Sequence, residues 1–234
     1  LNCATRLLLV CAECRTELPP HAKFCVNCAA PTGGGQDLAL TRALQRLVPG
    51  DYAERLRTAR GQPSPERRAV TILFSDVVGS TAMAEELDPE EWREIMDGAF
   101  DVLIEPVYRY EGTLARLMGD AVLAFFGAPI AHEDDPERAI RAALEIIEGA
   151  REYAERLEQE RGVTGFGVRV GIHTGLVVVG EVGSDLRVEY TAMGDAINLA
   201  SRMESAAEPG TVLITEATHK LIAPLFETEA LGPI

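Results

Sequence analysis

The feature that most constrains this chain is the segment AVTILFSDVVGST, residues 69–81, in which an apolar, β-branched run ends in one carboxylate. Such a run predicts a buried strand, and the Gly-Ser-Thr sequence after it predicts a turn into a helix. The first N–H groups of that helix would be free to bind an anion beside Asp76. An acid next to such a turn is typical of a site where a metal ion bridges a carboxylate and a phosphate. Taken alone, Asp76 could equally be a turn or helix-cap residue.

A second carboxylate stands in a similar position further along the chain. In RLMGDAVLAFFG, residues 116–127, two apolar runs flank Gly119 and Asp120, which predicts a β-hairpin. If the strands that carry Asp76 and Asp120 are neighbours, both carboxylates lie at the same edge of one sheet. Two like charges at that separation repel each other unless divalent cations lie between them. The pair therefore predicts a site for metal ions.

Four segments resemble, in order and spacing, the catalytic domain of the class III nucleotidyl cyclases, the adenylate and guanylate cyclases. They are FSDVVGST, LMGDAVLAFFGAP, VRVGIHTGLVVVG and YTAMGDAINLASRM, and the similarity runs from Arg67 to the end of the chain. The resemblance implies an α+β fold, a ferredoxin-like antiparallel sheet with flanking helices. The order of the predicted strands and helices agrees with that fold.

The resemblance also implies an activity, the conversion of ATP to 3′,5′-cyclic AMP and pyrophosphate in cyclic-nucleotide signalling. The site residues that it implies are Asp76, Val77 and Asp120 for two Mg²⁺ or Mn²⁺ ions, Val78, Gly79, Ser80 and Thr81 for the phosphates, Asn198 and Arg202 for catalysis, and Arg116 and Thr191 for the base. Asn198 would orient the ribose, and Arg202 would stabilise charge on the α-phosphoryl oxygens. These two residues stand four apart in a predicted helix, so they share one face.

The choice of base rests on Arg116 and Thr191. Members of this family that make cyclic AMP usually carry Lys at the first position and Asp or Thr at the second, whereas guanylate cyclases carry Glu and Cys. Thr191 therefore favours ATP, and Arg116 keeps the donor charge. Because an Arg side chain can also address the guanine O6 and N7 edge, a guanylate cyclase is the alternative.

The family resemblance implies a homodimer, in which the metal-binding acids of one subunit face the Asn and Arg of the other. This chain carries both halves, so we expect two composite sites per dimer. The sequence stops at Ile234, where relatives continue into a hairpin with a phosphate-binding Lys, so we expect this C-terminal hairpin to be missing. A catalytically silent dimerisation and signal-relay module is an alternative. A polymerase-like or dinucleotide cyclase is disfavoured, because the Asn-x-x-x-Arg helix has no role there.

Two cysteine pairs precede the cyclase-like region. Four thiolates in two CxxC pairs predict a structural zinc ribbon over residues 1–32, with one Zn²⁺ held by Cys11, Cys14, Cys25 and Cys28. The ribbon is a possible contact for a protein partner. Residues 33–66 predict a linker with an amphipathic helix, whose apolar residues include Leu44, Tyr52 and Leu56. This linker is either a spacer or a transmitter that couples the ribbon to the catalytic domain, residues 67–234.

The net charge of the chain argues against some classes of binding partner. A formal net charge of -15 argues against general binding to nucleic acid or to an anionic membrane, because both require a basic surface. No run of about 18 apolar residues occurs, so we predict no membrane span and a cytoplasmic location.

Two histidines, His132 and His173, are candidates for a functional role. His132, with Glu133 to Asp135, is predicted to form a solvated loop and a helix cap rather than a metal site. His173 is predicted to be a packing residue at a strand end, between two strands within residues 166–182, rather than a catalytic base.

Overall fold

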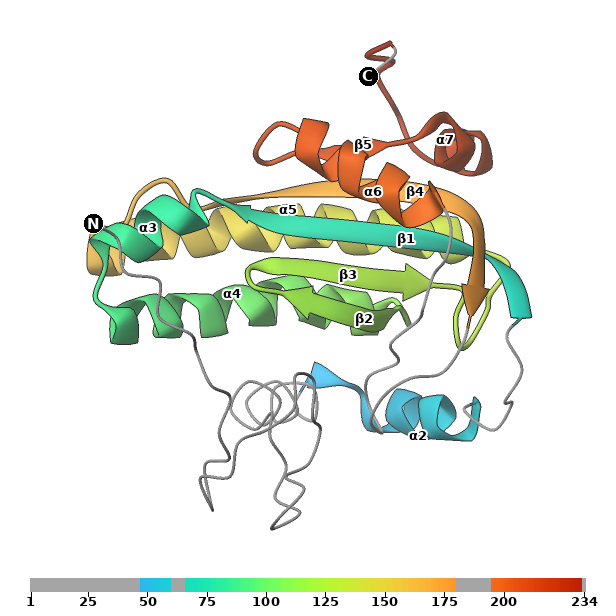
Figure 1. The fold of residues 1–234 in the computed structure, drawn as a ribbon, viewed down its shortest axis with the longest axis horizontal. Coiled ribbons are helices and arrows are strands. Elements are labelled where there is room, and N and C mark those ends of the chain that lie inside the picture. Colours follow the sequence, from blue (N-terminus) through green and yellow to red (C-terminus); the bar gives the residue numbers. More distant parts are fainter. Residues whose placement is uncertain (1–46, 60–65, 180–194, 233–234) are drawn as a thin grey trace, which may run out of the picture. The chain divides into compact units, whose positions relative to one another are not determined.

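Strand β1, Glu66–Val78, is the central strand of a five-stranded sheet with the order β2-β3-β1-β4-β5 (Figure 1). The computed structural model describes residues 47–59, 66–179 and 195–232, which belong to one compact unit, Arg46–Ile234. The other strands are β2 Thr113–Met118, β3 Ala121–Phe126, β4 Gly167–Val179 and β5 Val212–Ile214. The predicted hairpin is thus confirmed as β2 and β3, which pair antiparallel around Gly119 and Asp120.

Helices cover both faces of the sheet. On one face Val70 and Ile72 of β1 share an apolar cluster with Ala196 and Ala200 of helix α6, Asp195–Ala206. The alternate residue Leu73 is fully buried too, because side chains alternate across a strand and a second layer covers the opposite face. That layer is formed by α4 Pro89–Arg109 and α5 Asp135–Arg161, which pack on each other and on the sheet (Figure 1). The predicted α+β architecture is confirmed.

Local signals place the helices that follow β1. Gly79 has a left-handed φ of 76° and turns the chain into the short helix α3, Ser80–Glu86. Asp88 caps α4, since its carboxylate accepts a hydrogen bond of 2.9 Å from the N–H of Glu90. The last helix in the described ranges is α7, Glu216–Ile222, which is capped by the Thr215 hydroxyl.

The sheet is not wholly antiparallel. Strand β5 pairs parallel to β4, whereas β1–β3, β1–β4 and β2–β3 are antiparallel pairs. The reason is the connection: α6 lies between β4 and β5, and a crossover through a helix returns the chain in the same direction.

The prediction of two strands around His173 was wrong. Strand β4 is continuous, and His173 and Thr174 pair with Ile72 and Thr71 of β1 without interruption. The hydroxyls of Thr71 and Thr174 lie 3.0 Å apart across the pair, so β1 holds the whole segment extended. His173 is buried in the middle of the strand with its Nδ1 atom 2.9 Å from the Thr215 hydroxyl, which agrees with packing but not with a strand end.

The predicted solvated loop and cap before α5 are found at Glu133 and Asp134, which are exposed and of which Asp134 is the N-cap residue, but the prediction was wrong for Asp135. Asp135 is the first residue of α5, not its cap, and it is only 6% exposed. Its carboxylate turns back and accepts a hydrogen bond of 2.8 Å from the N–H of His132. In this position the carboxylate is shielded from solvent.

Several predictions fall outside the described residues. These are the four zinc-ribbon cysteines Cys11, Cys14, Cys25 and Cys28, the first part of the linker helix, and Thr191. The later part of the linker helix is described as α2, Gly50–Ala59. No helix in the described ranges is both long and apolar enough to cross a membrane.

Helix α6 can pack closely on strand β4 because residue 171 is a glycine. A Cβ atom at Gly171 would lie 2.0 Å from the Glu204 nitrogen and 2.4 Å from the Ala200 oxygen, both backbone atoms. We predict that Gly171→Ala lowers the free energy of unfolding by about 2 kcal/mol or more, because the helix must move away. Gly50→Ala is the matched control, since a Cβ there meets nothing within 4 Å. Equal stability of the two variants in urea unfolding would contradict this packing.

Candidate active site

The sheet brings the two predicted metal-binding acids together. Asp76 near the end of β1 pairs with Ala121, the first residue of β3, and Asp120 is the residue just before it. The negative charge of Asp120 acts on Asp76 and raises its pKa. The expectation that both carboxylates lie at one sheet edge is therefore met by the strand order β3-β1.

Asp76 lies in an environment that disfavours its charge. Its side chain is only 23% exposed, and this burial is the main cause that raises the pKa of the carboxyl group, with the charge of Asp120 adding to it. A guanidinium nitrogen of Arg169 lies 3.2 Å from the carboxylate and opposes the shift. A further cation near Asp76 and Asp120 would relieve the remaining repulsion.

Two charged residues that the sequence reasoning missed complete this neighbourhood. Arg169 on β4 pairs across the sheet with Asp76, and its Nε atom lies 2.5 Å from a carboxylate oxygen of Glu204 on α6. Burial raises the pKa of Glu204, while Arg169 lowers it. A signal was present in the sequence: Arg169 interrupts the apolar run FGVRVGI, and a charge inside a buried strand requires a partner.

Helix α6 presents Asn198 and Arg202 on its outer side. The inner side consists of Ala196, Ala200 and Glu204, which are buried at four-residue steps against the sheet. Asn198 and Arg202 follow these positions by two residues, roughly half a turn around the helix, and both are exposed. Across the described ranges, no hydrogen bond or ion pair joins either side chain to Asp76 or Asp120. A single chain therefore does not assemble all four residues through direct contacts.

The other predicted residues in the described ranges lie on β2, at the end of β1 and at the start of α3. Arg116 is exposed on β2, the edge strand that leads directly into Asp120. On the other strand, Val77 is buried, and Val78 and Gly79 lead into α3 with the partly exposed Ser80. The first N–H groups of a helix have no partner within it, so those of Ser80 and Thr81 can meet an anion here.

The chemistry of the donors suits a hard divalent cation. Carboxylate and backbone carbonyl oxygens are ligands that Mg²⁺ and Mn²⁺ prefer. In the part of the chain that the structure describes, no group of three or more His, Cys, Asp or Glu side chains forms a closed metal cage. Asp76, Asp120 and the Val77 carbonyl would therefore leave coordination positions open to water or to a phosphorylated substrate.

Comparisons with known proteins point to one family. Residues 63–234 match the sequence profile described as "Adenylate and Guanylate cyclase catalytic domain". Adenylate cyclase 1 of Rhizobium meliloti is 40% identical over 138 residues, which are 59% of this chain and 21% of that protein. The chain thus spans about a fifth of the length of this curated relative.

Solved structures of both substrate classes are similar. The adenylyl cyclase CyaB from P. aeruginosa matches with a TM-score of 0.65 and 31% identity, over 69% of this chain and 84% of that one. The guanylyl cyclase Cya2 matches with a TM-score of 0.62 and 34% identity, over 67% and 79%. The resemblance found in the four sequence motifs is confirmed by these matches. The chain therefore belongs to the adenylate and guanylate cyclase catalytic domain family.

Proposed function

We propose that this chain is an adenylate cyclase, which converts ATP to 3′,5′-cyclic AMP and pyrophosphate as a homodimer. The observation that carries the proposal is the pair Asp76 and Asp120 at one sheet edge, where burial and the charge of Asp120 disfavour the ionised carboxylate of Asp76. Such a pair is suited to hold two divalent cations together with the phosphates of a nucleotide.

The reaction is an intramolecular transfer of a phosphoryl group. The ribose 3′-oxygen forms a bond to the α-phosphorus, the bond from that phosphorus to the pyrophosphate oxygen breaks, and the 3′-hydroxyl proton is released to solvent. Asp76, Asp120 and the Val77 carbonyl would hold two Mg²⁺ or Mn²⁺ ions. When bound, these ions supply positive charge that acidifies the hydroxyl and neutralises the leaving phosphates.

Groups of the protein itself bind the phosphates, orient the ribose and stabilise the developing charge. The backbone from Val78 to Thr81 binds the β- and γ-phosphates through the turn before α3. Asn198 orients the ribose, and Arg202 stabilises the charge that builds on the α-phosphoryl oxygens. With a cation on Asp76, the guanidinium of Arg169 keeps Glu204 as its partner and becomes available to a phosphate oxygen.

The direction of α6 supports a homodimer. The exposed face with Asn198 and Arg202 lies opposite the face that packs on the sheet, and neither residue contacts the acids of its own chain within the described ranges. A second copy can supply the missing half of each site, so two composite sites form in a symmetric dimer. A monomer would then be inactive.

The preference for ATP is supported by Arg116 and Thr191. Arg116 keeps a donor near the base, and Thr191 is the residue typical of cyclases that make cyclic AMP. A guanylate cyclase is the second candidate, because the Arg fork also fits the guanine edge and because similar structures of both classes exist.

The N-terminal cysteines add a separate element to the proposed function. Cys11, Cys14, Cys25 and Cys28 hold one structural Zn²⁺ in this proposal, because two CxxC pairs offer four thiolates for tetrahedral coordination. The ribbon would offer a protein partner a surface from which to control the cyclase.

Product analysis tests the activity. With Mn²⁺ and ATP, the full chain should form cyclic AMP and pyrophosphate, and Asp120→Ala should lower the rate by about a hundredfold or more, since it removes a ligand of the catalytic cations. The same assay with GTP separates the two candidates. Absence of any cyclic product from either nucleotide would overturn the proposal and favour the silent signal-relay module.

Mixing two inactive variants tests the composite site. Asp120→Ala and Arg202→Ala should each be inactive alone, because each lacks one half of every site. After random exchange of subunits in an equal mixture, about one quarter of the sites should be intact, all of them in mixed dimers. Recovery of about a quarter of the activity is therefore expected, with two copies of the same variant as the control. No recovery, despite mixed dimers detected by mass spectrometry, would contradict a shared site.

A further inference from the structure

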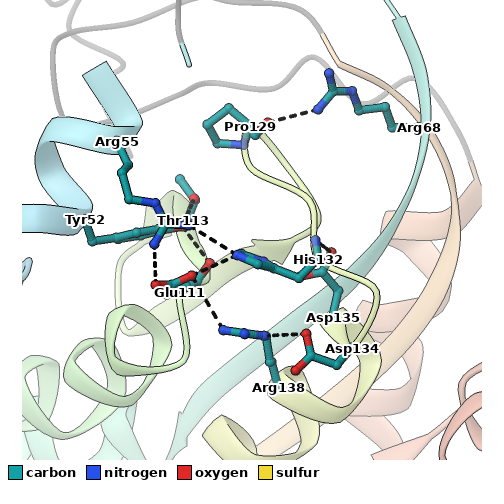
Figure 2. Close-up of polar contacts among 10 residues, drawn as sticks. All are labelled: Tyr52, Arg55, Arg68, Glu111, Thr113, Pro129, His132, Asp134, Asp135 and Arg138. Carbon is teal, nitrogen blue, oxygen red and sulfur yellow. Dashed lines mark hydrogen bonds and ion pairs between the residues drawn. The ribbon is translucent and has the colours of Figure 1, made fainter. Parts of the chain in front are cut away.

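Helix α2 is fastened to the start of strand β2 by one buried tyrosine. Tyr52 is 2% exposed, and its hydroxyl donates a 2.5 Å hydrogen bond to the backbone carbonyl of Glu111 (Figure 2). The same hydroxyl lies 3.3 Å from that of Thr113, the first residue of β2. Burial raises the pKa of Tyr52 to about 12, so the hydroxyl remains protonated and able to donate.

Glu111 joins three further side chains to this contact. Its carboxylate lies 2.5 Å from the Arg55 guanidinium of α2, 2.8 Å from Nε2 of His132 before α5, and 3.6 Å from Arg138 on α5 (Figure 2). His132 in turn contacts the buried Asp135 carboxylate at 3.2 Å. The α4–β2 turn is therefore held from several sides, and α2 supplies two of the contacts.

The backbone of this turn is in an unfavourable conformation. Glu111 has a φ of 57°, and it is the one residue other than glycine with positive φ in the described part of the chain. Side chains rarely adopt this left-handed region, and such a residue persists where its surroundings hold it in place. The contacts of Tyr52 and Arg55 are part of those surroundings.

Strand β2 is one of the two edge strands of the sheet, so contacts from outside the sheet help to hold it in place. It lies at the edge of the sheet and pairs only with β3, and its register shifts at a bulge between Leu114 and Arg116. A bulge changes the direction in which the following side chains point. The strand passes from its anchored start at Thr113 through this bulge to Arg116, and then to the turn with Asp120.

We propose that α2 positions strand β2, and that Tyr52 is the positioning residue that determines how Arg116 and Asp120 are presented to the nucleotide. The expected effect, a change in base selection at Arg116, rests on the proposed function. The linker helix is then a transmitter rather than a spacer. A partner that pulled α2 away from Glu111 would release the start of β2, the strand that carries the residue for the base.

A matched pair of variants separates positioning from stability. Tyr52→Phe removes the hydroxyl and leaves the ring packed edge-on against Tyr108. Tyr153→Phe is the control, because that hydroxyl also donates to a backbone carbonyl, that of Ile95 at 2.8 Å, and its ring also packs edge-on, against Phe166. Tyr153 lies on α5, and its hydrogen bond and ring contacts in the described part of the chain are with Ile95, Phe166 and Arg156, none of which is on β2. Arg55→Met is a second test variant that leaves the core untouched, since Arg55 is exposed.

Two readouts on the full chain decide the question. The first is the ratio of kcat/KM for ATP to that for GTP, which should fall about fivefold in Tyr52→Phe, the effect of one ordinary hydrogen bond, and stay unchanged in Tyr153→Phe. The second is amide hydrogen exchange over residues 113–118 without nucleotide, which should become faster in Tyr52→Phe and Arg55→Met only. The melting temperatures of the two tyrosine variants should be similar.

The outcomes are distinct from a failure of the proposed function. A chain with no cyclase activity would overturn the adenylate cyclase proposal, while exchange over β2 would still test the role of Tyr52. Unchanged exchange over β2 in both Tyr52→Phe and Arg55→Met would overturn the positioning role. Faster exchange with an unchanged nucleotide ratio would also overturn it, because Tyr52 would then only stabilise the strand.

Discussion

The repulsion between Asp76 and Asp120 is the constraint on which the proposed site depends. The sheet places Asp76 on β1 and Asp120 in the turn that leads into the neighbouring strand β3, and the burial of Asp76 makes its charge harder to maintain. A protein without a use for this arrangement would gain stability by neutralising one of the acids. Arg169 compensates only in part, because its guanidinium is shared with the buried Glu204. The unfavourable charge is explained if divalent cations and a nucleotide occupy this edge during function.

The packing of α6 on the sheet explains why Asn198 and Arg202 do not face Asp76 and Asp120 of the same chain. Helix α6 packs so closely on β4 that Gly171 has no room for a side chain, and its inner face is fully used by Ala196, Ala200 and Glu204. Asn198 and Arg202 are left on the exposed side. Because a rigid packed helix cannot turn both faces inward, a second copy of the chain is the simplest source of the missing groups for each pair of acids.

Sequence reasoning predicted the parts of the fold that depend on local signals. The apolar run before Asp76 and the hairpin at Gly119 were predicted correctly, since each is encoded in a few adjacent residues. The continuous strand through His173 was missed because pairing with β1 overrides a local Thr-Gly break signal. The buried Asp135, the Arg169 pair with Asp76 and the docking of Tyr52 depend on residues far apart in the sequence. Their partners could not be identified without the fold.

The stability of Asp120→Asn, measured with and without Mn²⁺, tests the central claim most directly. Without metal, this variant should melt at a higher temperature than the wild type, because it removes the charge that opposes Asp76. With Mn²⁺ and a non-reactive ATP analogue, the wild type should gain stability and the variant should gain much less. A variant that is less stable than the wild type in EDTA, or that gains as much from Mn²⁺, would contradict the account.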